Sequence, residues 1–184
     1  MKRHSVILLL VAFTVLSCST TKIVATPQQI LILDDIVKEQ SFVIVSDWAL
    51  PQSTGSLLTL QNAGLLAAGD SANSINLIGN ANELKINKNI VSSKLPYFGE
   101  VLTNTGYNGS DNSISFDGEM KDYRVIKNEK GSYTIRFDAR SNSEKFDVII
   151  HLFSDLKSEI ILKGAKRFPI RYTGVVSSIS EETE

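Results

Sequence analysis

Cysteine and histidine are the scarcest reactive side chains in this sequence, and their scarcity excludes several kinds of site. The 184 residues contain one cysteine, Cys18, and two histidines, His4 and His151. A single cysteine cannot form an internal disulfide or a cysteine-based metal cluster. If the N-terminal segment with His4 is removed, one histidine remains, which leaves little for a two-histidine metal site or a histidine-based triad. We therefore expect neither a metal nor a cofactor.

Recognisable catalytic motifs are also absent from the sequence. It contains no phosphate-binding loop, dinucleotide fingerprint or nucleophile elbow. The densest carboxylate group is Asp117, Glu119 and Asp122, whose oxygens are ligands that calcium accepts, but its spacing is not that of an EF-hand. Turn chemistry explains these residues better. His151 alternates with Ile150 and Leu152 and is interpreted as a surface or half-buried side chain. No catalytic residue is assigned, and an enzyme is the least favoured of three functional classes.

Neither sign of charge dominates the chain. It has 19 basic and 20 acidic residues, and removal of Lys2 and Arg3 with an N-terminal signal would leave a small negative charge. Both signs are scattered and form no basic patch, so nucleic acid is not an expected partner. No stretch after Cys18 is long and apolar enough to be predicted to span a bilayer.

The N-terminus has the pattern of a secretory signal peptide. Lys2 and Arg3 precede an apolar run over residues 6–16 that is interrupted by Thr14. This run is shorter than the roughly 20 residues of a membrane-spanning helix and is typical of a signal-peptide core. Residues 1–17 are therefore predicted to be the signal peptide.

The sequence Val15-Leu16-Ser17-Cys18 resembles a bacterial lipobox, in which the cysteine becomes a lipidated N-terminus after cleavage. Two alternatives are cleavage by the ordinary signal peptidase near Ser17 and an uncleaved anchor. Acyl chains on Cys18 would anchor the protein to the membrane without spanning it, through a tether over residues 18–26. No acidic run follows Cys18, which favours an outer membrane lipoprotein that faces the periplasm.

One amphipathic helix is predicted at the start of the mature domain. Thr26 can cap it, Pro27 suits its first position, and Gln29 completes a capping box. Apolar residues then recur at helical spacing as far as Gln40. Asp34 and Asp35 are expected on the solvated face, because adjacent helical residues point about 100° apart.

The rest of the chain is predicted to be mainly β. Period-two alternation and turn signals place strands at residues 42–48, 75–78, 84–86, 90–97, 114–117, 123–127, 132–140, 145–153, 159–162 and 170–176. Short connections imply antiparallel neighbours. A sheet of about nine or ten such strands is expected to curl into a barrel or half-barrel, with the helix packed on it. Residues 27–176 form one domain, followed by a polar tail over residues 177–184.

Residues 52–73 do not fit this alternation. They are rich in glycine, alanine, serine and leucine. Either a short helix or an apolar loop is possible there. Because Leu65, Leu66, Ala67 and Ala68 are apolar, we expect the segment to pack against the domain.

The motif Leu95-Pro96-Tyr97-Phe98-Gly99 is the most distinctive part of the domain. Pro96 lacks an amide hydrogen and therefore belongs at a strand end, an edge or a bulge. Gly99 permits a close backbone approach. Adjacent aromatic residues in an extended chain point to opposite faces, so one ring can be buried while the other lines a rim. Pro96, Tyr97, Phe98, Gly99 and Tyr172 are the candidate binding or structural residues.

Four motifs, taken in order, carry a family resemblance. They are FVIV with ALP (residues 42–45 and 49–51), LPYFG (95–99), ISFDG with DY (114–118 and 122–123), and PIRYTG (169–174). Their order resembles a family of envelope lipoproteins catalogued as domain-of-unknown-function family 4251 (DUF4251). The segment over residues 53–72 is longer than is usual there, and Ser154-Asp155-Leu156 lacks an expected turn glycine. The resemblance implies no catalytic residues.

A small-ligand-binding module is the favoured function. A curled sheet with many aromatic residues can hold a lipid, a glycan or another apolar molecule in its concavity. The alternative is a protein-interaction or scaffold subunit of an envelope complex, which would show an exposed apolar patch or an unpaired strand edge.

Overall fold

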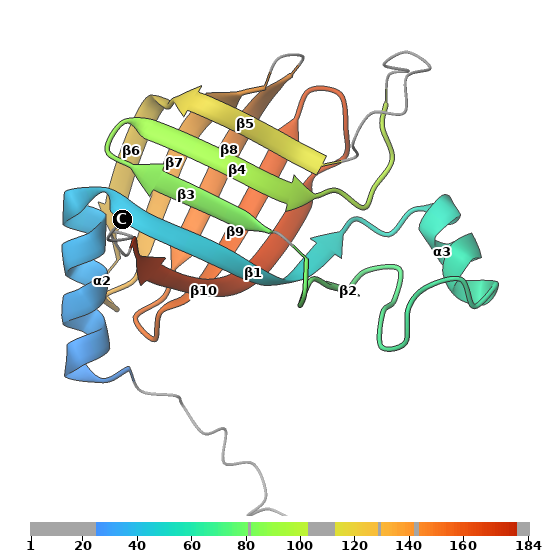
Figure 1. Ribbon diagram of the computed structural model, residues 1–184, viewed down its shortest axis with the longest axis horizontal. Coiled ribbons are helices and arrows are strands. Elements are labelled where there is room, and N and C mark those ends of the chain that lie inside the picture. Colours follow the sequence, from blue (N-terminus) through green and yellow to red (C-terminus); the bar gives the residue numbers. More distant parts are fainter. Residues whose placement is uncertain (1–24, 81, 103–112, 129, 142–143, 180–184) are drawn as a thin grey trace, which may run out of the picture.

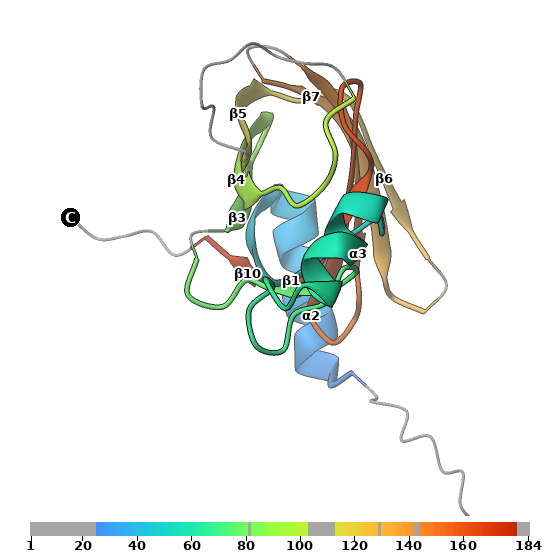
Figure 2. The ribbon, with the colours of Figure 1, turned by 90° about the vertical axis from the view of Figure 1, so that its right-hand side faces the viewer.

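A ten-stranded antiparallel sheet curls into a nearly closed barrel, with one helix at each end (Figures 1 and 2). The computed structural model describes residues 25–80, 82–102, 113–128, 130–141 and 144–179. Cys18, with the rest of the predicted signal peptide and most of the tether, lies outside the described residues. The predicted mainly β barrel is confirmed. Within the described ranges, no helix has the length and apolar character needed to cross a bilayer.

The elements follow one another closely along the chain. The helices are α2 (Pro27–Glu39) and α3 (Gly55–Asn62). The strands are β1 (Ser41–Pro51), β2 (Ile75–Asn76), β3 (Glu83–Asn87), β4 (Ile90–Pro96), β5 (Ser113–Glu119), β6 (Lys121–Lys127), β7 (Tyr133–Arg140), β8 (Lys145–Leu152), β9 (Lys157–Gly164) and β10 (Ile170–Ser178).

Two meanders are joined by the first strand. The sheet order is β5-β4-β3-β1-β10-β9-β8-β7-β6, and the short β2 pairs with β1 beside this path. β1 therefore lies between β3 and β10, with Phe42 opposite both Ile86 and Ser178. β5 and β6 form the two ends of the sheet. They do not pair with each other, although only Met120 separates them, and β5 contacts β7 across the seam.

Helix α2 closes one end of the barrel. The capping box is present: the Thr26 hydroxyl accepts the Gln29 amide at 3.2 Å, and the Gln29 side chain accepts the Thr26 amide at 2.8 Å. Leu33, Ile36 and Val37 are buried on the inward face. The outward face is less free of contacts than predicted, because Asp34 accepts hydrogen bonds from Lys127 and Tyr133.

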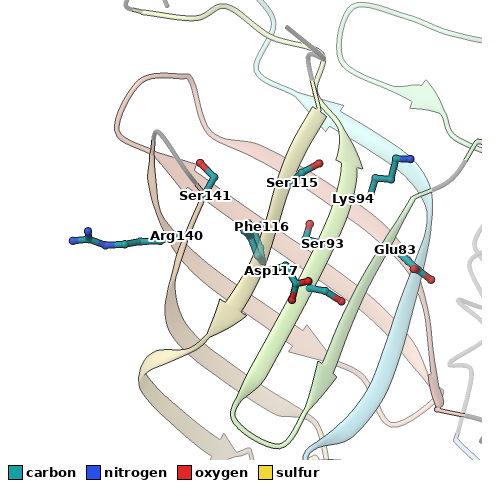
Figure 3. A pocket seen from close by; sticks show the side chains of 9 residues that line it. Glu83, Ser93, Lys94, Ser115, Phe116, Asp117, Arg140 and Ser141 are labelled. Carbon is teal, nitrogen blue, oxygen red and sulfur yellow. The ribbon is translucent and has the colours of Figure 1, made fainter.

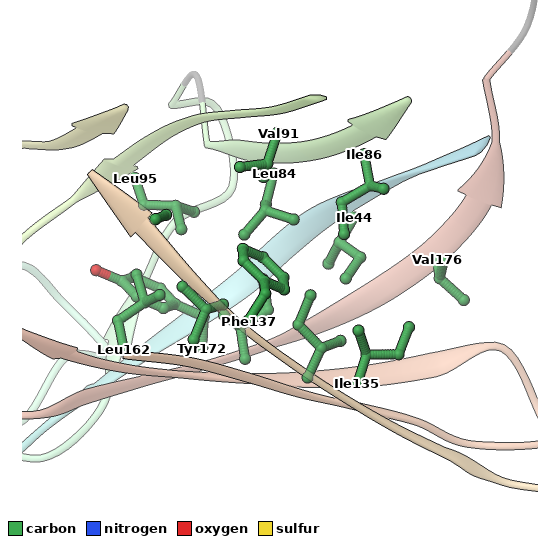
Figure 4. Packing of buried hydrophobic residues seen from close by; sticks show 14 of the residues in the cluster. Ile44, Leu84, Ile86, Val91, Leu95, Ile135, Phe137, Leu162, Tyr172 and Val176 are labelled. Carbon is green, nitrogen blue, oxygen red and sulfur yellow. The ribbon is translucent and has the colours of Figure 1, made fainter. Parts of the chain in front are cut away.

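The interior of the barrel is its hydrophobic core (Figure 4). Alternate residues of the strands point inward, and Phe42, Phe137, Phe146 and Tyr172 are the largest fully buried side chains. In Figure 4, side chains from opposite walls meet in the centre, Leu84 on one side and Phe137 on the other. The concave face is therefore occupied by the protein's own side chains, and this removes the structural basis of the expected ligand site there.

Residues 54–69 form an arm at the end opposite α2 (Figure 1). α3 is the short helix that the sequence left open as one possibility. The expectation that this segment packs against the domain is not met: Leu57 is buried, whereas Leu65 is 70% exposed and Ala67 and Ala68 are exposed. Few of the apolar side chains in the arm are buried, so the arm does not pack closely against the barrel.

Candidate functional site

The LPYFG motif crosses the end of the barrel that lies opposite α2. β4 ends at Pro96, and the chain then turns across the opening. Tyr97 is 6% exposed, and its hydroxyl lies 3.0 Å from the Glu100 carbonyl oxygen and 3.1 Å from that of Phe168. Phe98 is half-buried against the edge of the core. One ring is thus buried and the other lies at the rim, as the alternation predicted.

Tyr172 joins the same cluster from β10. Its hydroxyl donates a 2.9 Å hydrogen bond to the Pro96 carbonyl oxygen. Gly99 is required beside Tyr97, because a Cβ atom there would lie 2.5 Å from the Tyr97 hydroxyl oxygen. Burial raises the pKa of both Tyr97 and Tyr172. The five candidate residues therefore form a structural closure of the barrel end, with Phe98 the most accessible of the three aromatic rings.

A buried ion pair that the sequence did not reveal supports this closure. The Arg167 Nε atom donates to the Glu144 carboxylate at 2.9 Å, and the side chains are 17% and 1% exposed. The Lys166 amide donates to the other carboxylate oxygen at 2.7 Å. The guanidinium lies 4.8 Å from the centre of the Tyr97 ring and 5.6 Å from that of Phe146. Glu144 follows a hairpin turn, and no local sequence signal connects it to Arg167.

An open groove lies at the seam of the barrel, where β5 approaches the end of β7 (Figure 3). Its volume is about 430 Å³. The residues that line it come from four strands and the turn after β7: Glu83, Ser92, Ser93, Lys94, Ser115, Phe116, Asp117, Arg140 and Ser141. The volume lies within the range of about 300–1,000 Å³ that is usual for small-molecule sites.

Most of the residues that line the groove are polar or charged, although their apolar atoms form much of its surface. Within the described part of the chain, Glu83, Lys94, Asp117 and Arg140 make no ion pair or side-chain hydrogen bond, although Glu83 and Lys94 are opposite each other on β3 and β4. Phe116 points toward the interior in Figure 3, where its ring lies 5.8 Å from that of Phe146. The groove therefore combines polar and charged side chains with an aromatic ring on its inner side. The sequence could not show that these four charged side chains lie together, because their grouping depends on the strand order.

The carboxylates that the sequence singled out, Asp117, Glu119 and Asp122, line one pocket together with Lys121 and Lys145, and His151 is not among the lining residues. Among the described residues, no group of three or more histidine, cysteine, aspartate or glutamate side chains is arranged to hold a metal ion. The turn interpretation is wrong for Asp117 and Glu119, which lie in β5, whereas Asp122 has a left-handed backbone (φ 54°) at the bulge of β6. His151 is half-buried, with its Nδ1 atom 3.2 Å from the Thr134 hydroxyl.

Comparison with known proteins places the fold in a family. No curated protein matches this sequence. A crystal structure of a DUF4251 family protein from Bacteroides eggerthii is similar with a TM-score of 0.54 and 13% identity, over 82% of this chain and 88% of that chain. The family model described as "Domain of unknown function (DUF4251)" matches residues 26–176, which include every strand except the end of β10. The chain therefore belongs to the DUF4251 family.

Proposed function

We propose that this protein binds a neutral, hydroxyl-rich ligand, such as a short glycan, in the seam groove. One observation carries the proposal. Four charged side chains surround a groove of about 430 Å³, and among the described residues they form no ion pair or side-chain hydrogen bond. Two of them, Glu83 and Asp117, are acceptors, and two, Lys94 and Arg140, are donors. The lining therefore has no net formal charge.

Hydroxyl groups match this lining, because each hydroxyl both donates and accepts hydrogen bonds. Bonds from hydroxyls to carboxylates, and from cationic groups to hydroxyls, are charge-assisted and stronger than neutral ones. Ser92 also lines the groove and adds a further hydroxyl. An anion or a cation would meet two groups of its own sign. A lipid chain is disfavoured because the apolar barrel interior is filled by core residues.

The role that we propose is non-catalytic. The described side chains that line the groove include no histidine or cysteine, and the Ser93 hydroxyl donates a 3.2 Å hydrogen bond to the Ile114 carbonyl oxygen. The groups that the groove offers to a ligand are therefore hydroxyls, carboxylates and cations, which form hydrogen bonds. Recognition, rather than turnover, is the chemistry that these groups support.

Saturation-transfer NMR with a panel of neutral di- and trisaccharides tests the proposal. We expect transfer to at least one sugar, and a loss of binding of about tenfold or more for Arg140→Ala and Asp117→Ala. Lys38→Ala is the matched control, because Lys38 is exposed on α2 and does not line the groove. Binding of a fatty acid in place of all sugars, or sugar binding that the groove variants leave unchanged, would refute the proposal.

The cellular address is part of the same proposal. We propose an outer membrane lipoprotein, anchored through Cys18 and facing the periplasm, with signal cleavage before that residue. The lipobox-like sequence and the lack of a following acidic run support it. Cys18→Ala should release the domain into the soluble periplasmic fraction. A variant that still partitions wholly with membranes would contradict lipid anchoring.

An interaction role is the second candidate, as a scaffold subunit of an envelope complex. The specific observation in its favour is the arm that contains α3, where Leu58 and Leu60 are 46% and 40% exposed. Exposed apolar patches on a soluble domain mark contact surfaces. This role does not exclude ligand binding, because α3 is not part of the groove lining.

A further inference from the structure

Strand β6 forms one end of the sheet and has a free edge. Among the described strands it pairs with β7 alone, and all of its residues except Tyr123 are exposed. Figure 2 shows it at the outside of the barrel. The last strand of a sheet presents a row of backbone N–H and C=O groups that lack a partner strand, and such a row can pair with another chain.

The register with β7 shows which backbone groups face this free edge. The Asn128 amide donates to the Ser132 carbonyl oxygen at 2.8 Å, so these two residues form a hydrogen-bonded pair. In an antiparallel ladder such pairs alternate with non-hydrogen-bonded pairs, and β6 stays in register from Lys127 back to Arg124. The N–H and C=O groups of Val125 and Lys127 therefore point away from β7, to the free edge.

The free edge is regular over its second half. Bulges commonly protect an edge strand against pairing with another chain. The bulge of β6 lies between Lys121 and Arg124, so it leaves the residues after Arg124 in a regular strand. Val125 and Ile126, which point to opposite faces of this strand, are 38% and 58% exposed. This part of β6 therefore offers an added strand both backbone groups and apolar side chains.

Unpaired positive charge beside the edge determines which partner fits it. Arg124 and Arg136 lie directly opposite each other on β6 and β7. Both are exposed, and neither forms an ion pair with a described residue. Asp138, the acidic residue of β7, is paired with Lys145 at 2.6 Å instead. Because like charges directly opposite each other are destabilising, an acidic side chain beside Arg124 would stabilise this face of the sheet.

We infer that the free edge of β6 binds an extended acidic segment of another protein, which adds to the sheet as a further strand. Backbone hydrogen bonds to Val125 and Lys127 hold this segment, as in other cases of strand addition. Successive side chains of a strand point to opposite faces. Acidic residues at every second position of the segment therefore lie on the face of Arg124, and apolar residues between them lie on the face of Val125.

A second copy of β6 fits the edge less well than an acidic segment does. Each β6 carries three basic side chains, Lys121, Arg124 and Lys127, and one acidic side chain, Asp122. Two paired copies would therefore bring an excess of like charge together, which is costly across an interface.

Fluorescence anisotropy with a labelled octapeptide of alternating glutamate and valine tests the inference. The protein is the chain from residue 19 onward, which contains every described helix and strand. We expect saturable binding in the micromolar range, weakened about tenfold or more by Arg124→Glu because like charges then face each other. Lys88→Glu is the matched control and should bind as the wild type does, since Lys88 is exposed in the turn between β3 and β4.

The backbone contacts are tested separately from the charge. Val125→Pro removes the amide hydrogen that faces the free edge and keeps the hydrogen bonds to β7, so it should weaken binding strongly. Val125→Ala keeps this amide and should bind more tightly than Val125→Pro. Hydrogen exchange followed by NMR should show slower exchange of the Val125 and Lys127 amides when the peptide is bound.

Four results would overturn the inference. They are no binding of the glutamate–valine peptide, equal binding of a lysine–valine peptide, bound peptide that leaves exchange of the Val125 amide unchanged, and a dimer without peptide that Val125→Pro disrupts. Circular dichroism of each variant confirms that the barrel is folded. Arg140→Ala and Asp117→Ala, which test sugar binding, do not lie on β6, so the two proposals can fail independently.

Discussion

The hydroxyl of Tyr172 donates a 2.9 Å hydrogen bond to the carbonyl oxygen of Pro96, 76 residues away in the sequence. This bond joins the PIRYTG motif on β10 to the LPYFG motif at the end of β4. Tyr172 is fully buried, so its hydroxyl has no access to solvent as an alternative partner. Two motifs that the sequence presented separately are therefore parts of one structural closure.

Loss of this hydroxyl should destabilise the protein. We expect Tyr172→Phe to lower the free energy of unfolding by about 1–3 kcal/mol, because it removes the bond and leaves the Pro96 carbonyl oxygen with one partner fewer. Tyr123→Phe is the matched control. The Tyr123 hydroxyl is buried without a hydrogen-bond partner among the described residues, so its removal should leave stability unchanged or raise it. Urea unfolding measures both variants, and equal losses would contradict the assignment.

Alkaline pH should destabilise the fold through its tyrosines. Burial raises the pKa of Tyr97, Tyr123, Tyr133 and Tyr172, and that of Tyr123 to about 12. As the pH rises above 10, the unfolded chain loses these protons more readily than the folded chain does. The unfolded state then binds fewer protons, so the free energy of unfolding falls as pH rises through this range.

Unfolding curves from pH 8 to 12, with tyrosinate absorbance recorded in parallel, check this expectation. Tyr123→Phe should make the fall in stability shallower than in the wild type. Ionisation of all the tyrosines near pH 10 in a chain that is still folded would show that their rings are not buried as described.

Local sequence patterns predicted the elements because alternation and capping depend on neighbouring residues. Thr26, Pro27 and Gln29 specify the start of α2, and the alternation of residues 132–140 matches β7 (Tyr133–Arg140) closely. The order of the strands in the sheet was harder to predict from the sequence. The pairing of β1 with β10 joins Phe42 to Ser178, and no short-range pattern records such a contact.

The candidate site was predictable in part for the same reason. The LPYFG motif predicts a strand end, and in the structure β4 ends at Pro96 within this motif. The groove combines side chains from β3, β4, β5 and β7, so its composition follows from sheet order rather than from sequence neighbours. The arm was expected to pack because leucines are usually buried. The arm extends beyond the barrel (Figure 1), and Leu65 is 70% exposed, so the general tendency does not hold there.

Removal of one partner from the buried ion pair should be costly. Glu144→Ala leaves Arg167, which is 17% exposed, without its carboxylate, and we expect a loss of about 3–5 kcal/mol. Glu159→Ala is the control, because the Arg171–Glu159 pair is more exposed and should contribute about 0–1 kcal/mol. Chemical denaturation of the two variants gives the comparison. Similar small losses for both would show that the Glu144 pair is not buried in solution.

Gly174 tests the contact between the first and last strands. It lies on β10 opposite Ser46, at the irregularity in β1. A Cβ atom at this position would lie 2.7 Å from the Ser46 Cα atom and closer still to the Val45 carbonyl oxygen. Both are backbone atoms, which cannot rotate away as a side chain could. We expect Gly174→Ala to lower the free energy of unfolding by about 3 kcal/mol or more, because β1 and β10 would have to separate.

Gly55→Ala is the matched control for this substitution. A Cβ atom at Gly55 would meet no atom within 4 Å, and the residue begins α3, where alanine is a better helix former than glycine. We therefore expect its stability to be unchanged or higher by up to about 1 kcal/mol. Thermal unfolding of the two variants, which add the same methyl group, measures the difference directly. A Gly174→Ala protein as stable as the Gly55→Ala protein would mean that β1 and β10 do not approach as closely as described, and that the pairing that joins the two meanders is looser.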